Sequence, residues 1–189
     1  GKMILRRESV DLGDVVRAVV TELMPLADAR KQKLETHVER ISELDADRDK
    51  LHQIAVNLVS NAIRYTEDQG AIDVHVDEAP RDRYPGGWAR LRVRDNGVGI
   101  AEADRQRICD PFLHTQPAEH HTSAGPDSAG RGLYIARGLI ELHGGHIASV
   151  TVWAGLVAFW KGQGGASPRA CTSAPMNASA MITTPSKMW

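Results

Sequence analysis

The amino-acid sequence predicts a domain of the α+β class, because helical and strand patterns both recur along its 189 residues. Apolar residues repeat at helical spacing in two long segments, and they alternate with polar residues in several short ones. With 42% hydrophobic residues, the chain can bury a substantial core. Its length fits one domain with additional segments, or at most two small domains.

The first half of the sequence contains two helical segments separated by a strand. Residues 8–33 predict a helix that Asp11 or Asp14 can cap at its N-terminus. Residues 34–39 alternate in polarity, which indicates a strand. The clearest helix covers residues 47–66, and its apolar stripe consists of Leu51, Ile54, Ala55, Leu58, Val59, Ala62 and Ile63.

The second half is richer in strands. Residues 70–78 and 88–95 alternate on either side of a turn that contains proline and glycine, which predicts a β-hairpin. A short helix is expected at residues 101–108, followed by a loop at residues 110–130. A helix at residues 131–145 should end at a glycine pair, and the strands 146–152 and 155–160 should form a final pair.

Composition and charge argue against several functional classes. The 23 basic and 24 acidic residues give a net charge of -1, which offers no general reason to expect a nucleic-acid or anionic-membrane partner. Cys109 and Cys171 lie far apart without metal-ligand spacing, so we expect a reducing compartment and no disulfide framework. No signal-peptide pattern opens the sequence. The longest apolar run, residues 147–160, is shorter than the ~20 residues that span a bilayer, so we expect no direct membrane insertion.

The last segment, residues 161–189, differs from the rest in composition. It is rich in alanine, serine, threonine, proline and glycine and contains no acidic residue. Because such a segment can bury little apolar surface, we expect a disordered tail. A divergent terminus and a shifted reading frame are both compatible with it.

Polar residues follow one face of the predicted helix at residues 47–66. Gln53, Asn57, Asn61 and Arg64 are spaced so that they share the face opposite the apolar stripe. Asparagine is a mediocre helix former, and two of them in line call for an explanation. The row fits either an ordinary solvated face or a set of amide oxygens and a cation that face hydrated Mg2+ and phosphates.

A carboxylate and two glycines come directly at the end of the strand 88–95. Asp95 offers two acceptor oxygens in a fixed place, which can receive the exocyclic amine of adenine. Gly97 and Gly99 allow a sharp turn and a close approach of the backbone to a planar base. Without a ligand, the same residues form an ordinary Asp-Asn-Gly turn.

Two weaker patterns lie further along the chain. The stretch "SAGRGLYIARG" (128–138) is a glycine-rich loop that runs into a helix, whose first amides can bind phosphate oxygens, although its spacing is neither Rossmann nor Walker. Histidines in the loop and beside the Gly144-Gly145 turn make a zinc site conceivable, but no cysteine or carboxylate stands at ligand spacing. Loop polarity and a histidine at a helix C-terminus account for them more simply.

Taken in order, the motifs resemble the ATP-binding catalytic domain of sensor histidine kinases, whose superfamily includes gyrase, the heat-shock chaperone and the mismatch-repair ATPases. The resemblance covers about residues 30–150. "NLVSNAIRYT" (57–66), "DNGVGI" (95–100), "ICDPF" (108–112) and "GRGLYIARGLIELHGGHI" (130–147) resemble the N box, first glycine box, F box and second glycine box. This implies a Bergerat-type ATP-binding fold, a two-layer α/β sandwich with a mixed sheet covered on one face by helices.

The resemblance also implies a site for ATP and Mg2+, with residues 110–130 as a lid. Asp95 would bind the adenine amine, and Asn61 would ligate Mg2+. The residues implied as catalytic are Asn57, Asn61 and Arg64. Those implied to bind the nucleotide are Asn57, Asn61, Arg64, Tyr65, Asp95, Gly97, Gly99, Ile100, Phe112, Gly130, Arg131, Gly132 and Leu133.

Three positions depart from the family pattern. Ser128 stands where a glycine is usual, and Arg131 where a leucine is usual. After the F box, His114 is the only candidate for the basic residue that often reaches the γ-phosphate.

The resemblance further implies two protein partners and a cytoplasmic location. None of the eight histidines lies in an acceptor box like His-Glu-x-x-Thr-Pro, so the acceptor is expected on a separate histidine-containing dimerisation domain, with a response regulator as the final acceptor. We therefore expect a linker or remnant of a dimerisation helix at residues 1–30, the catalytic domain at residues 31–160 and the tail at residues 161–189. Two alternatives stay open, a serine kinase of the anti-sigma-factor type and a non-catalytic nucleotide-binding module.

Overall fold

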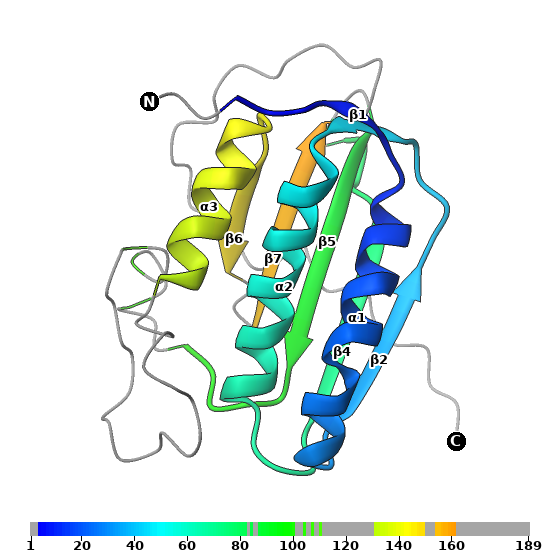
Figure 1. Cartoon of the computed structure of the whole chain (residues 1–189). Helices are drawn as coiled ribbons and strands as arrows, with labels where there is room; N and C mark the ends of the chain where they lie inside the picture. Colours follow the sequence, from blue (N-terminus) through cyan, green and yellow to red (C-terminus); the bar gives the residue numbers. More distant parts are fainter. Residues whose placement is uncertain are drawn as a thin grey trace.

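The computed structural model describes residues 4–82, 84, 87–100, 104, 107, 110, 131–149 and 154–161. Within these residues, three helices cover one face of a five-stranded mixed sheet (Figure 1). The helices are α1 (Leu12–Ala29), α2 (Arg48–Tyr65) and α3 (Gly132–Leu142). The strands are β1 (Glu8–Val10), β2 (Lys33–Val38), β3 (Leu44–Ala46), β4 (Ala71–Glu78), β5 (Trp88–Asp95), β6 (His146–Ser149) and β7 (Ala154–Lys161). This two-layer arrangement confirms the expected α+β fold.

The strand order places β5 at the centre of the large sheet, which runs β2-β4-β5-β7-β6. β2 and β4 are parallel, whereas β5 is antiparallel to both β4 and β7, so the predicted hairpin is confirmed. β6 and β7 form the expected last pair and are antiparallel. β5 ends at Asp95, at the same end of the molecule as the last turn of α2 and the first turn of α3 (Figure 1).

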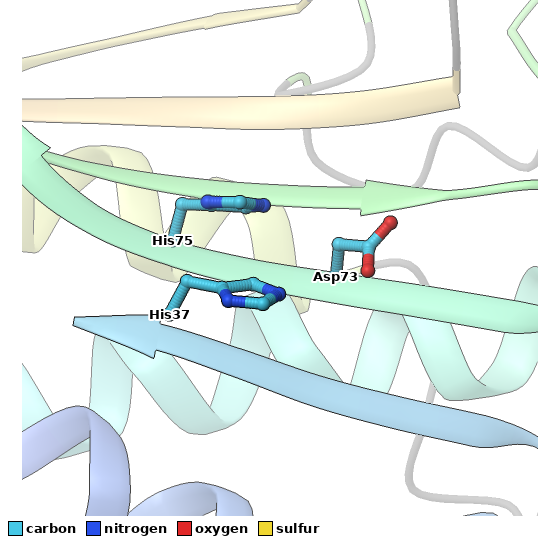
Figure 2. A group of neighbouring side chains, drawn as sticks. All are labelled: His37, Asp73 and His75. Atoms are coloured by element: carbon cyan, nitrogen blue, oxygen red, sulfur yellow. The ribbon is translucent and has the colours of Figure 1, made fainter. Parts of the chain in front are cut away.

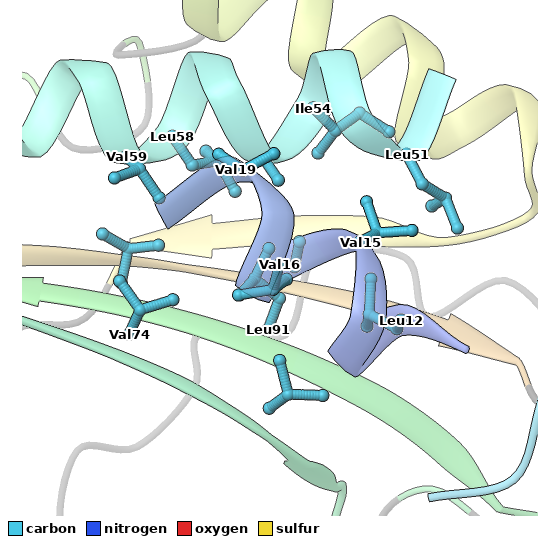
Figure 3. Packing of buried hydrophobic residues seen from close by; sticks show 14 of the residues in the cluster. Leu12, Val15, Val16, Val19, Leu51, Ile54, Leu58, Val59, Val74 and Leu91 are labelled. Carbon is cyan, nitrogen blue, oxygen red and sulfur yellow. The ribbon is translucent and has the colours of Figure 1, made fainter. Parts of the chain in front are cut away.

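The core lies between the helices and the sheet. Alternate residues of β4 and β5 point toward α1 and α2, whose apolar stripes close over them, as Figure 3 shows for Leu12, Val15, Val16, Val19, Leu51, Ile54, Leu58, Val59, Val74 and Leu91. Burial of each such side chain contributes about 1.5–3 kcal/mol. α1 lies within the segment that we expected to precede the catalytic domain, and it contributes to the same core as the sheet.

Both long helices begin at an aspartate. The Asp11 carboxylate accepts hydrogen bonds from the amides of Gly13 at 2.7 Å and Asp14 at 3.2 Å, so Asp11 is the N-cap of α1. The Asp47 carboxylate accepts from the amide of Lys50 at 3.1 Å at the start of α2. Because an N-cap has extended backbone, the helix expected from residue 8 begins only after Asp11.

A small second sheet precedes the two long helices and was not expected from the sequence. Residues 8–10, predicted as helix, form β1 instead and pair antiparallel with β3. Of the other predicted elements, the short helix at residues 101–108, the loop at residues 110–130 and the tail at residues 161–189 lie wholly or mostly outside the described residues.

A buried histidine fixes α3 against α2. The Nδ1 of His143 donates to the carbonyl oxygen of Leu139 at 2.7 Å, and its Nε2 accepts from the amide of Asp47 at 3.1 Å. The end of α3 is therefore hydrogen-bonded to the N-cap of α2. Among the described residues, no helix is long and apolar enough to cross a bilayer.

Candidate functional site

The polar face of α2 remains polar in the folded chain, but it is not uniformly solvated. Gln53, near the start of the row, is exposed, whereas Asn57, Asn61 and Arg64 are half-buried. The side-chain nitrogen of Asn57 is buried and has no hydrogen-bond partner among the described residues. A buried donor without a partner lowers the stability of the fold by about 1–3 kcal/mol. The Asn57 nitrogen is therefore suited to donate a hydrogen bond to an acceptor from outside the described chain.

The last turn of α2 carries a cation beside an aromatic ring. The guanidinium carbon of Arg64 lies 5.6 Å from the centre of the Tyr65 ring, and both side chains are half-buried. The geometry is that of a cation–π contact. It holds the Arg64 side chain near the end of the helix, where the chain from β5 also arrives.

Asp95 is a half-buried carboxylate at the end of the central strand. One of its oxygens, Oδ1, accepts a hydrogen bond from the amide of Gly97 at 3.0 Å. Burial raises the pKa of Asp95 to about 6, although the Gly97 amide acts in the opposite direction. The carboxylate forms no ion pair with any cation of the described part of the chain.

Gly97 joins the loop after β5 to the end of α2. A Cβ added at Gly97 would lie 2.2 Å from the backbone oxygen of Tyr65, which leaves no room for a side chain. The amide of Val98 also donates to the same Tyr65 oxygen, at 3.4 Å. The close approach that this glycine permits is therefore to α2.

At Gly99 the backbone conformation, rather than close packing, favours a glycine. Its φ of +73° lies in the left-handed region, although a Cβ there would meet nothing within 4 Å. The next residue, Ile100, is partly buried and packs against the main core. The loop thus leaves β5, turns at Gly99 and is anchored again at Ile100.

The start of α3 lies beside α2. A Cβ added at Gly132 would be 3.8 Å from the Oδ1 of Asn57. Arg131, at the N-cap position, makes no side-chain capping bond, and no acidic residue stands in the first turn. Arg131 is exposed, while Leu133 is partly buried against the core. Among the described residues, Arg131 leaves the first amides of α3 without a side-chain cap, and these amides can receive an anion.

The structure brings two predicted segments to α2. Tyr65 contacts the loop that begins at Asp95, and Asn57 lies near the start of α3 at Gly132. Two of the predicted nucleotide-binding residues, Phe112 and Gly130, lie outside the described residues.

Sequence reasoning missed two residues that hold the end of α2. The buried side chain of Gln32 donates through Nε2 to the carbonyl oxygens of Ile63 at 3.0 Å and Thr66 at 2.8 Å. Arg30 also donates to Ile63 and forms an ion pair with Asp68 at 2.9 Å. A single glutamine between a helix and a strand carries no pattern that would have revealed this role.

The zinc site that the histidines made conceivable is not supported where the structure describes them. Both ring nitrogens of His143 are occupied by backbone groups. The ring of His146 stacks on Phe159 at 4.5 Å and on Tyr84 at 5.5 Å, and its Nε2 lies 3.1 Å from the Tyr84 hydroxyl. These two histidines therefore have structural roles.

Comparison with known proteins identifies one matching family. The model of the histidine kinase-, DNA gyrase B- and HSP90-like ATPases matches residues 46–173. The Non-motile and phage-resistance protein of Caulobacter vibrioides is 34% identical over 145 residues, which cover 77% of this chain and 17% of that protein. An uncharacterized sensor-like histidine kinase of Rhizobium meliloti is 31% identical over 182 residues, which cover 93% of this chain and 33% of that protein.

The fold has a solved counterpart. The crystal structure of full-length ShkA in complex with AMPPNP aligns with a TM-score of 0.69 and 25% identity, over 89% of this chain and 33% of ShkA. The chain thus spans 17% and 33% of the lengths of the two relatives above. These matches confirm the resemblance that the four motifs indicated.

Proposed function

The chain belongs to the family of histidine kinase-, DNA gyrase B- and HSP90-like ATPases, and on that premise we propose that it is the catalytic domain of a two-component sensor histidine kinase. It would bind ATP with Mg2+ and transfer the γ-phosphoryl group to a histidine on a separate dimerisation domain. The group would then pass to an aspartate of a response regulator in the cytoplasm. The sensor-like histidine kinase among the relatives supports the activity, and the AMPPNP complex of ShkA supports the nucleotide.

The carboxylate of Asp95 is the observation that carries the proposal. It is fixed by the Gly97 amide at the end of β5, half-buried and without an ion-pair partner among the described residues. Burying a charge without a partner is costly, so the group fits a ligand that donates a hydrogen bond. The exocyclic amine of adenine is such a donor. Above the raised pKa of about 6, the ionised carboxylate can make a charge-assisted bond to it.

The opposite end of the proposed site suits phosphate. The buried nitrogen of Asn57 is a donor, and the nearby first amides of α3 receive no capping bond from the side chain of Arg131. Both can bind phosphate oxygens, and the helix dipole favours a negative charge at this position. Arg64, half-buried near the end of α2, would add a positive charge.

Asn61 is the residue that we propose to hold Mg2+. Its half-buried amide shares the polar face with Asn57 and Arg64, and Mg2+ accepts neutral oxygen ligands while keeping several waters. When bound, the ion neutralises charge on the triphosphate. The chain's own residues would orient the γ-phosphoryl group, and the histidine of the partner domain would be the nucleophile.

Phosphoryl transfer can be measured with radiolabelled ATP. We expect little labelling of the chain alone, and labelling of a separately purified dimerisation domain from the same system when both are mixed. The label should be acid-labile, as phosphohistidine is, and its rate should rise with the concentration of the added domain. Acid-stable label would instead favour a serine kinase. Robust acid-labile labelling of the chain by itself would contradict the need for an acceptor in trans.

A further inference from the structure

Two histidines and an aspartate lie together on the face of the sheet that the helices do not cover. Ile72, Val74 and Val76 of β4 are buried in the core, so the residues that alternate with them, Asp73 and His75, project from the other face. His37 projects beside them from β2. None of these residues belongs to the proposed nucleotide site.

The sheet itself enforces this arrangement. His37 and His75 are register partners on the parallel strands β2 and β4, and Asp73 stands two residues before His75. The two imidazole rings are stacked, with centroids 4.6 Å apart and planes inclined by 25°. Figure 2 shows the rings side by side with Asp73 next along β4. One potential ligand atom from each side chain lies within 4.8 Å of the other two.

From this geometry we propose that His37, Asp73 and His75 form a binding site for a divalent transition-metal ion of the Zn2+ type. Two imidazole nitrogens and one carboxylate oxygen suit Zn2+, Ni2+ or Cu2+ better than Mg2+ or Ca2+. Three protein ligands leave further coordination positions for water. Tetrahedral ligands around Zn2+ would lie about 3.3 Å apart, so the distances of up to 4.8 Å between the ligand atoms would shorten by at most about 1.5 Å when an ion binds.

The surroundings of the cluster are compatible with a cation. Arg92, across from His75 on β5, is paired with Asp77, and Lys33 is paired with Glu35 at 2.9 Å. Asp73 forms no ion pair with another described residue.

A bound ion would connect the edge strand β2 to β4. Because β2 is the end strand of the large sheet, it has a strand neighbour on one side only within the described chain. An ion that binds the folded state but not the unfolded state raises the stability of the folded chain by mass action. The site thus predicts a metal-dependent increase in melting temperature that does not depend on ATP.

The test is a calorimetric titration of the chelator-treated chain with Zn2+ alone, at pH 7.5 and without nucleotide. We expect one ion per chain at this site and a melting temperature that rises with Zn2+. His37→Ala and His75→Ala should each weaken binding by at least about tenfold, and Asp73→Asn should weaken it as well. The visible absorption of bound Co2+ should also disappear in the His75→Ala variant.

Two control variants separate this site from other histidines. His52→Ala removes a half-buried histidine whose Nε2 lies 3.0 Å from a carboxylate oxygen of Glu22, and should leave Zn2+ binding unchanged. The triple variant His114→Gln, His120→Gln and His121→Gln should also retain the site. Absence of Zn2+ binding, or equal binding in wild type, His37→Ala and His75→Ala, would overturn the proposal. Circular dichroism without metal verifies that each variant is folded, and His75→Gln replaces His75→Ala if the latter is not.

Discussion

Gly97 lies so close to Tyr65 that a Cβ at position 97 would be 2.2 Å from the Tyr65 backbone oxygen. This contact joins two segments that are far apart in the sequence, the loop after β5 and the last turn of α2. The first carries Asp95, and the second carries Arg64. The contact therefore fixes the distance between the proposed adenine end and the α2 face of the site.

Gly97→Ala should weaken ATP binding, because either the loop or the end of α2 must move to admit the methyl group. The neighbouring atoms at position 97 include backbone atoms of Tyr65, which cannot rotate away as a side chain would. Gly138→Ala is the matched control, since nothing lies within 4 Å of a Cβ at that exposed helical position. It should stabilise the protein by about 0.5–1 kcal/mol. Equal ATP affinity in Gly97→Ala and wild type would contradict the account of the loop.

Asp95→Asn should stabilise the nucleotide-free protein at neutral pH. The raised pKa means that the folded chain keeps the Asp95 proton until about pH 6, whereas the unfolded chain loses it near 3.8. Stability contributed by this group is therefore present at low pH and falls as the pH rises between these two values. Denaturant unfolding measured from pH 3.5 to 7.5 should show that the free energy of unfolding of Asp95→Asn rises relative to that of wild type between about pH 3.8 and pH 6. A constant difference across the range would mean that the pKa is not raised.

Asn61→Ala should weaken Mg-ATP binding or transfer while leaving the melting temperature of the apo protein nearly unchanged. The residue lies on the polar face of α2, away from the core stripe. Gln53→Ala, at an exposed position of the same row, is the control and should change neither property. A large loss of apo stability in Asn61→Ala would indicate a structural role instead.

Gln32→Leu should destabilise the fold by about 1–3 kcal/mol, because carbonyl oxygens at the end of α2 lose a buried donor. The donor, Nε2, serves Ile63 at 3.0 Å, Thr66 at 2.8 Å and Glu67 at 3.2 Å. Urea denaturation measures the change. Gln53→Leu, an exposed glutamine on α2, should stay within about 0.5 kcal/mol of wild type. A neutral Gln32→Leu would show that water replaces the lost donor.

The long elements could be predicted because their periodicity is local. α2 and the β4–β5 hairpin are each specified by a continuous pattern of apolar residues, and the structure confirms them. β1 and β3 are only three residues long and pair across 34 or more positions, so no local pattern indicated them. The extended backbone at the Asp11 cap also ended the first helix earlier than its apolar pattern suggested.

For the candidate site, the sequence supplied proposed residues, whose roles stay predictions, but not the contacts that bring them together. The order of the motifs pointed to Asn57, Asn61 and Asp95, whereas the contact between Gly97 and Tyr65 depends on how the helix packs over the sheet. The cluster of His37 and His75 depends in the same way on strand register. A parallel pairing brings together residues 38 positions apart, and a shift by one residue would place them on opposite faces.

Calorimetric titration of the chain with Mg-ATP tests the central claim most directly, with Asp95→Asn beside wild type. Asp49→Asn is the matched control, because it removes an exposed carboxylate in the first turn of α2, at the opposite end of that helix. The account predicts saturable binding by wild type and Asp49→Asn. It predicts affinity lower by about ten- to a hundredfold in Asp95→Asn, from the loss of a charge-assisted hydrogen bond. Absence of Mg-ATP binding by wild type, or equal affinity in Asp95→Asn, would contradict it.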